Sequence, residues 1–166
     1  MPRFQPRVVI ETLNQHDVRY VLIGGVAATL HGSPLRTGDT DVCPATDTEN
    51  LARLAKALRT LNARIRTEGV EGGLPFACDP EFLAQMSLLN LETDAGDVDL
   101  SFAPSGTGGY QDLIANAETF DLDGVCAPTA ALADVIRSKK AADRPKDRLA
   151  LPVLEEIVRR TTQDPE

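Results

Sequence analysis

Residues 19–43 read RYVLIGGVAATLHGSPLRTGDTDVC. The β-rich run 19–23 ends at Gly24-Gly25, and residues 26–32 then carry the small and apolar side chains of a short helix that closes on a glycine. After a Ser-Pro breaker, residues 39–43 are interpreted as a second strand that ends at Pro44. The order predicts a strand, a glycine turn, a short helix and a second strand.

Helical periodicity is clearest over residues 46–62, where leucines and alanines recur three and four positions apart. Thr46 and Glu49 have the spacing of a capping box at its start. Residues 86–91 and 97–102 are predicted to be two strands joined by a turn. The other expected elements are an amphipathic stretch at 8–13, a loop at 67–80, a helix from Tyr110, β-like segments within 120–127, and two helices at 130–141 and 148–160.

The size and charge of the chain limit its possible functions. It has 166 residues, of which 42% are hydrophobic, so we expect one domain over 1–166 with loose tails at 1–5 and 161–166. Twenty-five acidic and seventeen basic side chains give a formal net charge of −8, which opposes non-specific binding to nucleic acid. Aromatic residues make up only 4%, with no Trp, which disfavours a base-stacking surface. A polyanionic partner therefore needs a local basic site or bound metal ions.

Cys43, Cys78 and Cys126 are widely spaced and odd in number, a pattern typical of neither a disulfide framework nor a zinc site. A reducing cytoplasm is the simplest compartment for such a chain. The N-terminal residues lack the apolar core of a signal peptide, and no run approaches the ~18 apolar residues of a membrane span. We expect a soluble cytoplasmic protein with no membrane partner.

Acids at alternating positions on two predicted strands are the main chemical feature. Asp39 and Asp41 project from one face of a strand, where like charges repel unless a cation lies between them. Mg²⁺ prefers carboxylate oxygens with phosphate and water, and two such ions can clamp a nucleotidyl displacement. Asp99 offers a third carboxylate, with Asp97 as the fallback. Exposed strand ends also carry acids without a metal, so an ordinary polar surface remains the alternative.

Two further features point to an anion. Gly24-Gly25 allows a sharp turn and presents backbone N–H groups to a phosphate, although a tight turn without a ligand has the same sequence. Six of the seventeen basic side chains fall within twelve positions near the C-terminus, which indicates either a local anion site or a solvated helix end. They are Arg137, Lys139, Lys140, Arg144, Lys146 and Arg148.

In combination these motifs resemble a known family. Residues 23–32, followed by Arg-Thr-Gly-Asp-Thr-Asp at 36–41, resemble the signature of the nucleotidyltransferase superfamily in its AbiEii-like branch, which includes toxin components of toxin–antitoxin systems. Gly-Asp-Val-Asp-Leu at 96–100 looks like the strand that carries that branch's third carboxylate, and residues 132–147 look like its C-terminal basic helix-turn. The resemblance covers residues 17–158.

The resemblance implies an α/β (α+β) fold, a small mixed β-sheet flanked by helices. It also implies that Gly24 and Gly25 bind a nucleoside triphosphate. Asp39 and Asp41 would hold Mg²⁺, with Mn²⁺ as the alternative ion, and Asp99 would complete the metal site and help to activate the acceptor. This set describes two-metal nucleotidyl transfer.

Three basic residues are implied to contact the nucleotide. Arg36 matches an arginine just ahead of the acids, Lys139 matches a lysine that could neutralise phosphate, and Arg144 lies in the basic helix-turn. Many superfamily members have Gly-Ser where this chain has Gly24-Gly25. A hydroxyl that often contacts phosphate is therefore missing, and backbone amides must suffice.

The resemblance favours an enzyme that transfers a nucleoside monophosphate from a nucleoside triphosphate to RNA such as tRNA, to a protein or to a small molecule. The toxin-like motifs favour RNA slightly, with 67–79, 106–109 and 137–148 as the segments that would bind the acceptor. A catalytically silent protein of the same fold, an antitoxin or a regulatory subunit, is the alternative, and a metal-dependent nuclease is a third. A cognate antitoxin or toxin is an expected partner.

Overall fold

One mixed sheet of seven strands runs through residues 3–163, the part of the chain that the computed structural model describes. The strands are β1 (Tyr20–Ile23), β2 (Asp39–Pro44), β3 (Arg64–Ile65), β4 (Leu88–Thr93), β5 (Gly96–Ser101), β6 (Glu118–Leu122) and β7 (Val125–Thr129). Their order is β3-β4-β5-β2-β1-β7-β6. β2 is parallel to β5 and β1 is parallel to β7, whereas the other neighbouring pairs are antiparallel.

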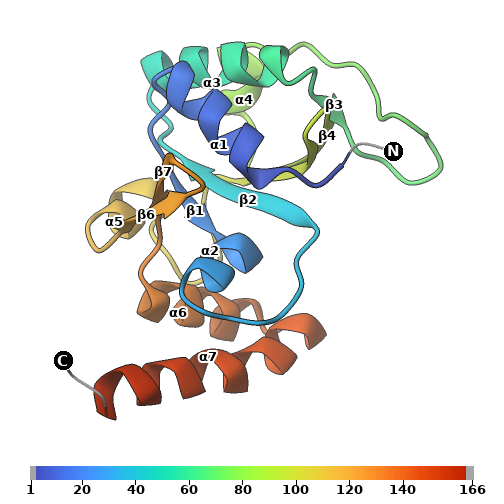
Figure 1. The fold of residues 1–166 in the computed structure, drawn as a ribbon. Coiled ribbons are helices and arrows are strands. Elements are labelled where there is room, and N and C mark those ends of the chain that lie inside the picture. Colours follow the sequence, from blue (N-terminus) through green and yellow to red (C-terminus); the bar gives the residue numbers. More distant parts are fainter. Residues whose placement is uncertain (1–2, 164–166) are drawn as a thin grey trace.

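Helices cover both faces of this sheet. They are α1 (Pro6–Gln15), α2 (Gly24–Leu30), α3 (Thr48–Thr60), α4 (Pro80–Ala84), α5 (Tyr110–Ile114), α6 (Leu132–Ala142) and α7 (Pro145–Gln163). α1, α3 and α4 lie on one face, and α2, α6 and α7 lie on the other (Figure 1). The expected mixed sheet flanked by helices is confirmed. No helix within residues 3–163 is both long enough and apolar enough to cross a membrane.

Side chains alternate along β1 and β2, so each strand contributes to two apolar layers. Leu22 and Val42 pack in the layer that includes α1 and α3, whereas Val21 and Cys43 pack in the layer that includes α2 and α6. All four of these side chains are fully buried. Asp41 is two residues from Cys43, so its carboxylate faces the α2 and α6 side of the sheet.

The start of α3 differs from the expected one. The helix begins at Thr48, and its N-cap is Asp47, whose carboxylate accepts a hydrogen bond of 3.0 Å from the backbone N–H of Asn50. The predicted capping box of Thr46 and Glu49 was wrong. Asn50 is fully buried and its side chain bonds the backbone of Arg19 at 2.7 and 2.9 Å, which fixes where the helix can start. A contact across 31 residues of chain thus selected the cap.

Other boundaries moved by a few residues. The expected 67–80 loop ends at Pro80, where the short helix α4 begins behind an Asp79 cap that the sequence analysis missed. The β-like segment 120–127 is a hairpin of β6 and β7, which turns at Asp123-Gly124, where both residues have positive φ. Strand propensity had predicted the hairpin but not its ends, whereas α4 was not predicted.

The expected loose tails lie partly within the described chain. Residues 161–163 continue α7 as helix, and the backbone N–H of Gln5 donates to the carbonyl of Ala95 at 3.0 Å. Residues 1–2 and 164–166 lie outside the described residues.

Candidate active site

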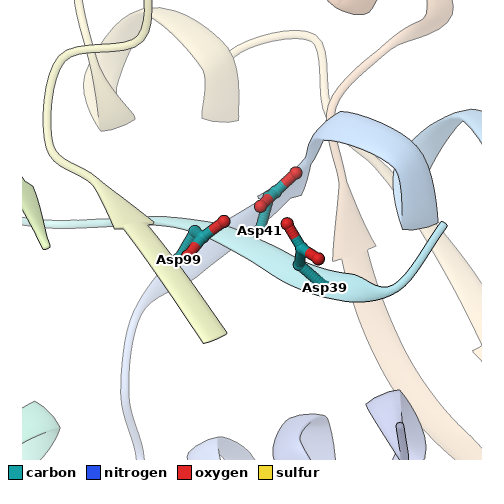
Figure 2. A group of neighbouring side chains, drawn as sticks. All are labelled: Asp39, Asp41 and Asp99. Carbon is teal, nitrogen blue, oxygen red and sulfur yellow. The ribbon is translucent and has the colours of Figure 1, made fainter. Parts of the chain in front are cut away.

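Parallel pairing of β2 with β5 brings the predicted acids together. Asp39 lies opposite Asp97 and Asp41 lies opposite Asp99 in the strand register. Asp39, Asp41 and Asp99 each offer a carboxylate oxygen within 4.8 Å of the others. Figure 2 shows the three side chains pointing to the same side of the sheet, next to the start of α2. The sequence analysis had named all three acids, and the pairing of β2 with β5 brings Asp99 next to the other two.

Burial and mutual repulsion perturb this cluster. Burial, followed by the charges of Asp99 and Asp39, raises the pKa of Asp41 to about 7. Burial and a hydrogen bond with Asp39 also raise the pKa of Asp99, although Arg66 acts in the opposite direction. The metal-free site therefore retains a proton near neutral pH. A divalent cation bound between the oxygens would offset the repulsion that holds this proton.

Gly24 marks the junction of β1 and α2. Its φ is +66°, and a Cβ at this position would lie 1.9 Å from Oδ2 of Asp41. Only glycine therefore allows the chain to pass this close to the acid cluster. Gly24 lines the cleft above the acids, whereas Gly25 is not among the lining residues. A Cβ on Gly25 would meet Oγ1 of Thr37 at 2.4 Å, so the space beside it is already filled.

Basic residues form part of the wall of the cleft, whose volume is about 600 Å³. This basic wall consists of Lys139 from α6, Arg144 from the turn between α6 and α7, and Lys146 from the first turn of α7. Asp147 is fully buried behind it and accepts hydrogen bonds from the backbone N–H and Nε of Arg144 at 3.1 and 2.7 Å. Nζ of Lys139 lies 3.6 Å from Oδ1 of the same carboxylate. The buried Asp147 thus holds in place Lys139 and Arg144, two residues that were predicted to contact the nucleotide.

Arg66 is a site residue that the sequence analysis missed. Its Nη2 donates to Oδ1 of Asp99 at 2.7 Å, and its Nη1 lies 3.3 Å from Oδ2 of Asp97. Burial acts to lower the pKa of Arg66, but the hydrogen bond and charge of Asp99 raise it overall. Asp97, the fallback acid, is therefore paired with Arg66 and lies outside the three-carboxylate cluster. No local motif indicates Arg66, because antiparallel pairing of β3 with β4 brings it to the site.

Arg36 and half of the basic segment lie elsewhere. Arg36 is exposed in the loop between α2 and β2 and is not among the residues that line the cleft. Arg137, Lys140 and Arg148 also lie outside the cleft lining. Each of these three pairs with a carboxylate, namely Arg137 with Asp112 and Asp134, Lys140 with Glu155, and Arg148 with Asp143. These three residues therefore fit the interpretation as a solvated helix end. Lys139, Arg144 and Lys146, which line the cleft, fit the interpretation as an anion site.

No protein-family model and no curated protein matches the sequence. The lincosamide antibiotic adenylyltransferase LnuA, solved with lincomycin bound, matches with a TM-score of 0.58 and 15% identity over 90% of this chain and 93% of that chain. A Thermotoga maritima protein assigned as a nucleotidyltransferase matches with a TM-score of 0.57 and 15% identity over 88% and 87%. The antibiotic-resistance factor ANT(2'')-Ia matches with a TM-score of 0.57 and 13% identity over 89% and 79%. The chain has the nucleotidyltransferase fold.

The fold places the three carboxylates and the basic wall in the lining of one cleft. At identities of 13% and 15%, the likeness of this chain to the solved nucleotidyltransferases is a likeness of fold. The fold that the sequence motifs implied is therefore confirmed, while the AbiEii-like branch stays a prediction.

Proposed function

We propose that the protein transfers a nucleoside monophosphate from a nucleoside triphosphate to an acceptor hydroxyl and releases pyrophosphate. One observation carries this proposal: three acids and three basic side chains line the same cleft of about 600 Å³, namely Asp39, Asp41 and Asp99 with Lys139, Arg144 and Lys146. Clustered carboxylates favour metal ions, and basic side chains in the same cleft favour phosphates. Together the two groups suit a complex of a metal ion with a triphosphate. The fold likeness to the adenylyltransferase LnuA supports the same reaction class.

The carboxylate cluster fits a divalent ion that prefers oxygen ligands, which is Mg²⁺ or Mn²⁺. Its three acids offer oxygens within 4.8 Å of one another, and the pKa of Asp41 is raised by burial and by the charges of Asp99 and Asp39, a repulsion that a bound cation would offset. When bound, such an ion would neutralise phosphate charge and orient the reacting groups. Asp39, Asp41 and Asp99 would be its protein ligands.

The chain's own groups have distinct parts in this proposal. Lys139, Arg144 and Lys146 bind the triphosphate and stabilise the charge that develops on pyrophosphate. The acceptor oxygen forms a bond to the α-phosphorus, the bond from that phosphorus to the bridging oxygen breaks, and pyrophosphate leaves with the electron pair. Asp99 accepts the hydroxyl proton, and its raised pKa makes it a stronger base than an exposed aspartate. Catalysis is therefore mainly positioning and electrostatics.

The finer assignments rest on the sequence motifs alone. Membership of the AbiEii-like branch, a toxin role and a cognate antitoxin or toxin partner are part of the proposal only through that resemblance. The slight preference for RNA also rests on the toxin-like motifs. Segment 137–148 was expected to bind such an acceptor, and three of its basic residues, Arg137, Lys140 and Arg148, are paired with acids of the protein itself.

Isothermal titration with each nucleoside triphosphate in the presence of Mg²⁺ tests the proposal. We expect at least one triphosphate to bind below millimolar concentration and Asp39→Asn to weaken binding by about tenfold or more, because it removes a metal ligand charge. Asp121→Asn, a matched change at an exposed position on β6, should bind like the native chain. Absence of binding for all four triphosphates at millimolar concentration would instead favour the catalytically silent alternative.

A further inference from the structure

Four acids of β2 and β5 form two opposed pairs in the sheet. Asp39 lies opposite Asp97, and Asp41 lies opposite Asp99. Because each strand carries its two acids at alternate positions, all four side chains emerge on one face. Within the described residues, however, the group of carboxylates that could hold a metal ion includes Asp99 and leaves out Asp97. A further residue must therefore distinguish the two acids of β5.

Arg66 contacts both acids of β5 with one guanidinium group. Its Nη2 donates to Oδ1 of Asp99 at 2.7 Å, and its Nη1 lies 3.3 Å from Oδ2 of Asp97. The contact with Asp99 is the shorter one, and Asp99 is also the more buried acid, with 18% of its side chain exposed against 38% for Asp97. A planar group that stays charged suits such a double contact, because its donors point in fixed directions.

The backbone of β4 fixes Arg66 independently of the acids. The backbone N–H of Arg66 donates to the carbonyl of Asn90 at 3.0 Å, and its Nη1 donates to the carbonyl of Leu91 at 3.2 Å. An ion pair between two freely moving surface side chains has no such anchor and contributes little. Here the donor is held by the main chain, so Arg66 can orient the carboxylate of Asp99.

Arg66 uses one of the two oxygens of Asp99. Within residues 3–163 it donates to Oδ1 of this carboxylate and not to Oδ2, so one oxygen is left for another partner. Figure 2 shows one oxygen of Asp99 directed toward the side on which Asp41 lies. Partners that hold the outer atom of a metal ligand orient the ligand in this way. A divalent ion would therefore meet a carboxylate that is already oriented.

We propose that Arg66 is a positioning residue for nucleotidyl transfer, which holds Asp99 through Oδ1 so that the other oxygen faces the metal ion and the acceptor hydroxyl. The inference rests on the proposed function, because it gives a further residue a part in that reaction. Arg66 acts through Asp99, whereas the proposed ligands of the triphosphate lie on the basic wall. The competing explanation is a role of charge alone, in which any positive side chain beside the acids would suffice.

Two substitutions separate orientation from charge. Arg66→Lys keeps the positive charge but loses the planar fork, whereas Arg66→Gln keeps a planar donor but loses the charge. Electron paramagnetic resonance measures the binding of Mn²⁺ without triphosphate, and Arg66→Lys should bind Mn²⁺ about tenfold more weakly than the native chain. Because this variant keeps the charge, the loss reports the orientation of Asp99.

Transfer and triphosphate binding are measured on the same variants. Incorporation of α-labelled triphosphate in cell extract should fall by about thirtyfold or more in both Arg66→Lys and Arg66→Gln. At saturating Mg²⁺, calorimetry should find triphosphate affinity within about threefold of native, because the basic wall is intact. Arg64→Lys, the same change on β3 at a residue outside the cleft lining, is the matched control and should behave like the native chain in all three measurements.

The outcomes separate this inference from the proposed function. If the native chain transfers α-label but Arg66→Lys keeps either native Mn²⁺ affinity or native transfer, the positioning role is overturned and the proposed function stands. Loss of transfer in Arg66→Gln alone would assign the effect to charge. If the native chain binds neither a triphosphate nor Mn²⁺ at millimolar concentration, the proposed function is overturned and this inference with it. Thermal unfolding reports whether the variants are folded, and unfolding of both at the assay temperature would leave Arg66 a structural part only.

Discussion

Replacing Asp41 with Asn tests the electrostatics of the acid cluster without any substrate. Burial and the charges of Asp99 and Asp39 raise the pKa of Asp41 from 3.8 to about 7 in the folded protein. Between pH 3.8 and about pH 7, the folded chain therefore binds more protons than the unfolded chain. The free energy of unfolding of the metal-free protein therefore falls as the pH rises through this window. Asn cannot ionise, so the variant should escape this loss.

The structure sets the size of the effect. A pKa of about 7 against 3.8 corresponds to about 4 kcal/mol at high pH, at 1.36 kcal/mol per pH unit. Because Asp39 and Asp99 share the protons and the cleft is open to water, we expect about 2 kcal/mol of this to be measured. For a chain of 166 residues, that gain raises Tm by about 4 to 8 °C. At pH 4 the native side chain is protonated, so the gain should nearly vanish.

Urea unfolding with EDTA at several pH values between 4 and 8 measures this gain for Asp41→Asn. Asp121→Asn, an exposed change on β6, is the control and should show little gain at any pH. Addition of Mg²⁺ at pH 8 should stabilise the native chain and leave Asp41→Asn nearly unchanged, since binding requires the ionised cluster. A gain that does not vary with pH, or an equal gain in the control, would refute the electrostatic reasoning.

Three further changes test other parts of the structure by urea unfolding. Gly24→Ala should lower the free energy of unfolding by about 2 to 4 kcal/mol, because the residue has a φ of +66° and a Cβ there would lie 1.9 Å from a carboxylate oxygen. In the control Gly38→Ala, the new Cβ would meet nothing within 4 Å, and the free energy of unfolding should stay within about 0.5 kcal/mol of the native value. Asp47→Ala should lower the free energy of unfolding by about 1 kcal/mol, because the N-cap of α3 is lost. If Thr46→Ala lowers it by the same amount, the assignment of Asp47 as the cap is contradicted. Asp147→Asn should lower the free energy of unfolding by about 1 to 3 kcal/mol, because Lys139 and Arg144 lose their buried partner. Calorimetry should also find that the triphosphate binds about tenfold more weakly, since these two cations line the cleft.

Local features of the sequence predicted the parts of the site that depend on local geometry. The two-residue spacing of Asp39 and Asp41 placed both side chains on one strand face. A short helix was predicted after the glycine turn, but α2 begins at Gly24 itself, so the two glycines form its first turn. Asp99 was expected as a third carboxylate from the alternating acids of its own strand, but no periodicity in the chain states which strands become neighbours. In the structure β5 pairs with β2, and Asp99 lies opposite Asp41 within the group of three carboxylates.

Long-range contacts account for what the sequence did not reveal. Arg66 reaches Asp99 across 33 residues of chain through the pairing of β3 with β4, and the cap of α3 depends on the contact between Asn50 and Arg19. The positions of basic residues likewise give no information about their partners. Lys139 and Lys140 are adjacent in sequence, yet one lines the cleft and the other pairs with Glu155 on α7.

The central claim is that the acid cluster and the basic wall together transfer a nucleotidyl group. Incubation of the protein and Mg²⁺ with cell extract, using triphosphates labelled at either the α- or the γ-phosphorus, tests it most directly. We predict that α-label enters an acceptor, that γ-label does not, and that Asp39→Asn reduces incorporation by about a hundredfold or more. Transfer of γ-label, or undiminished incorporation with Asp39→Asn, would contradict the claim.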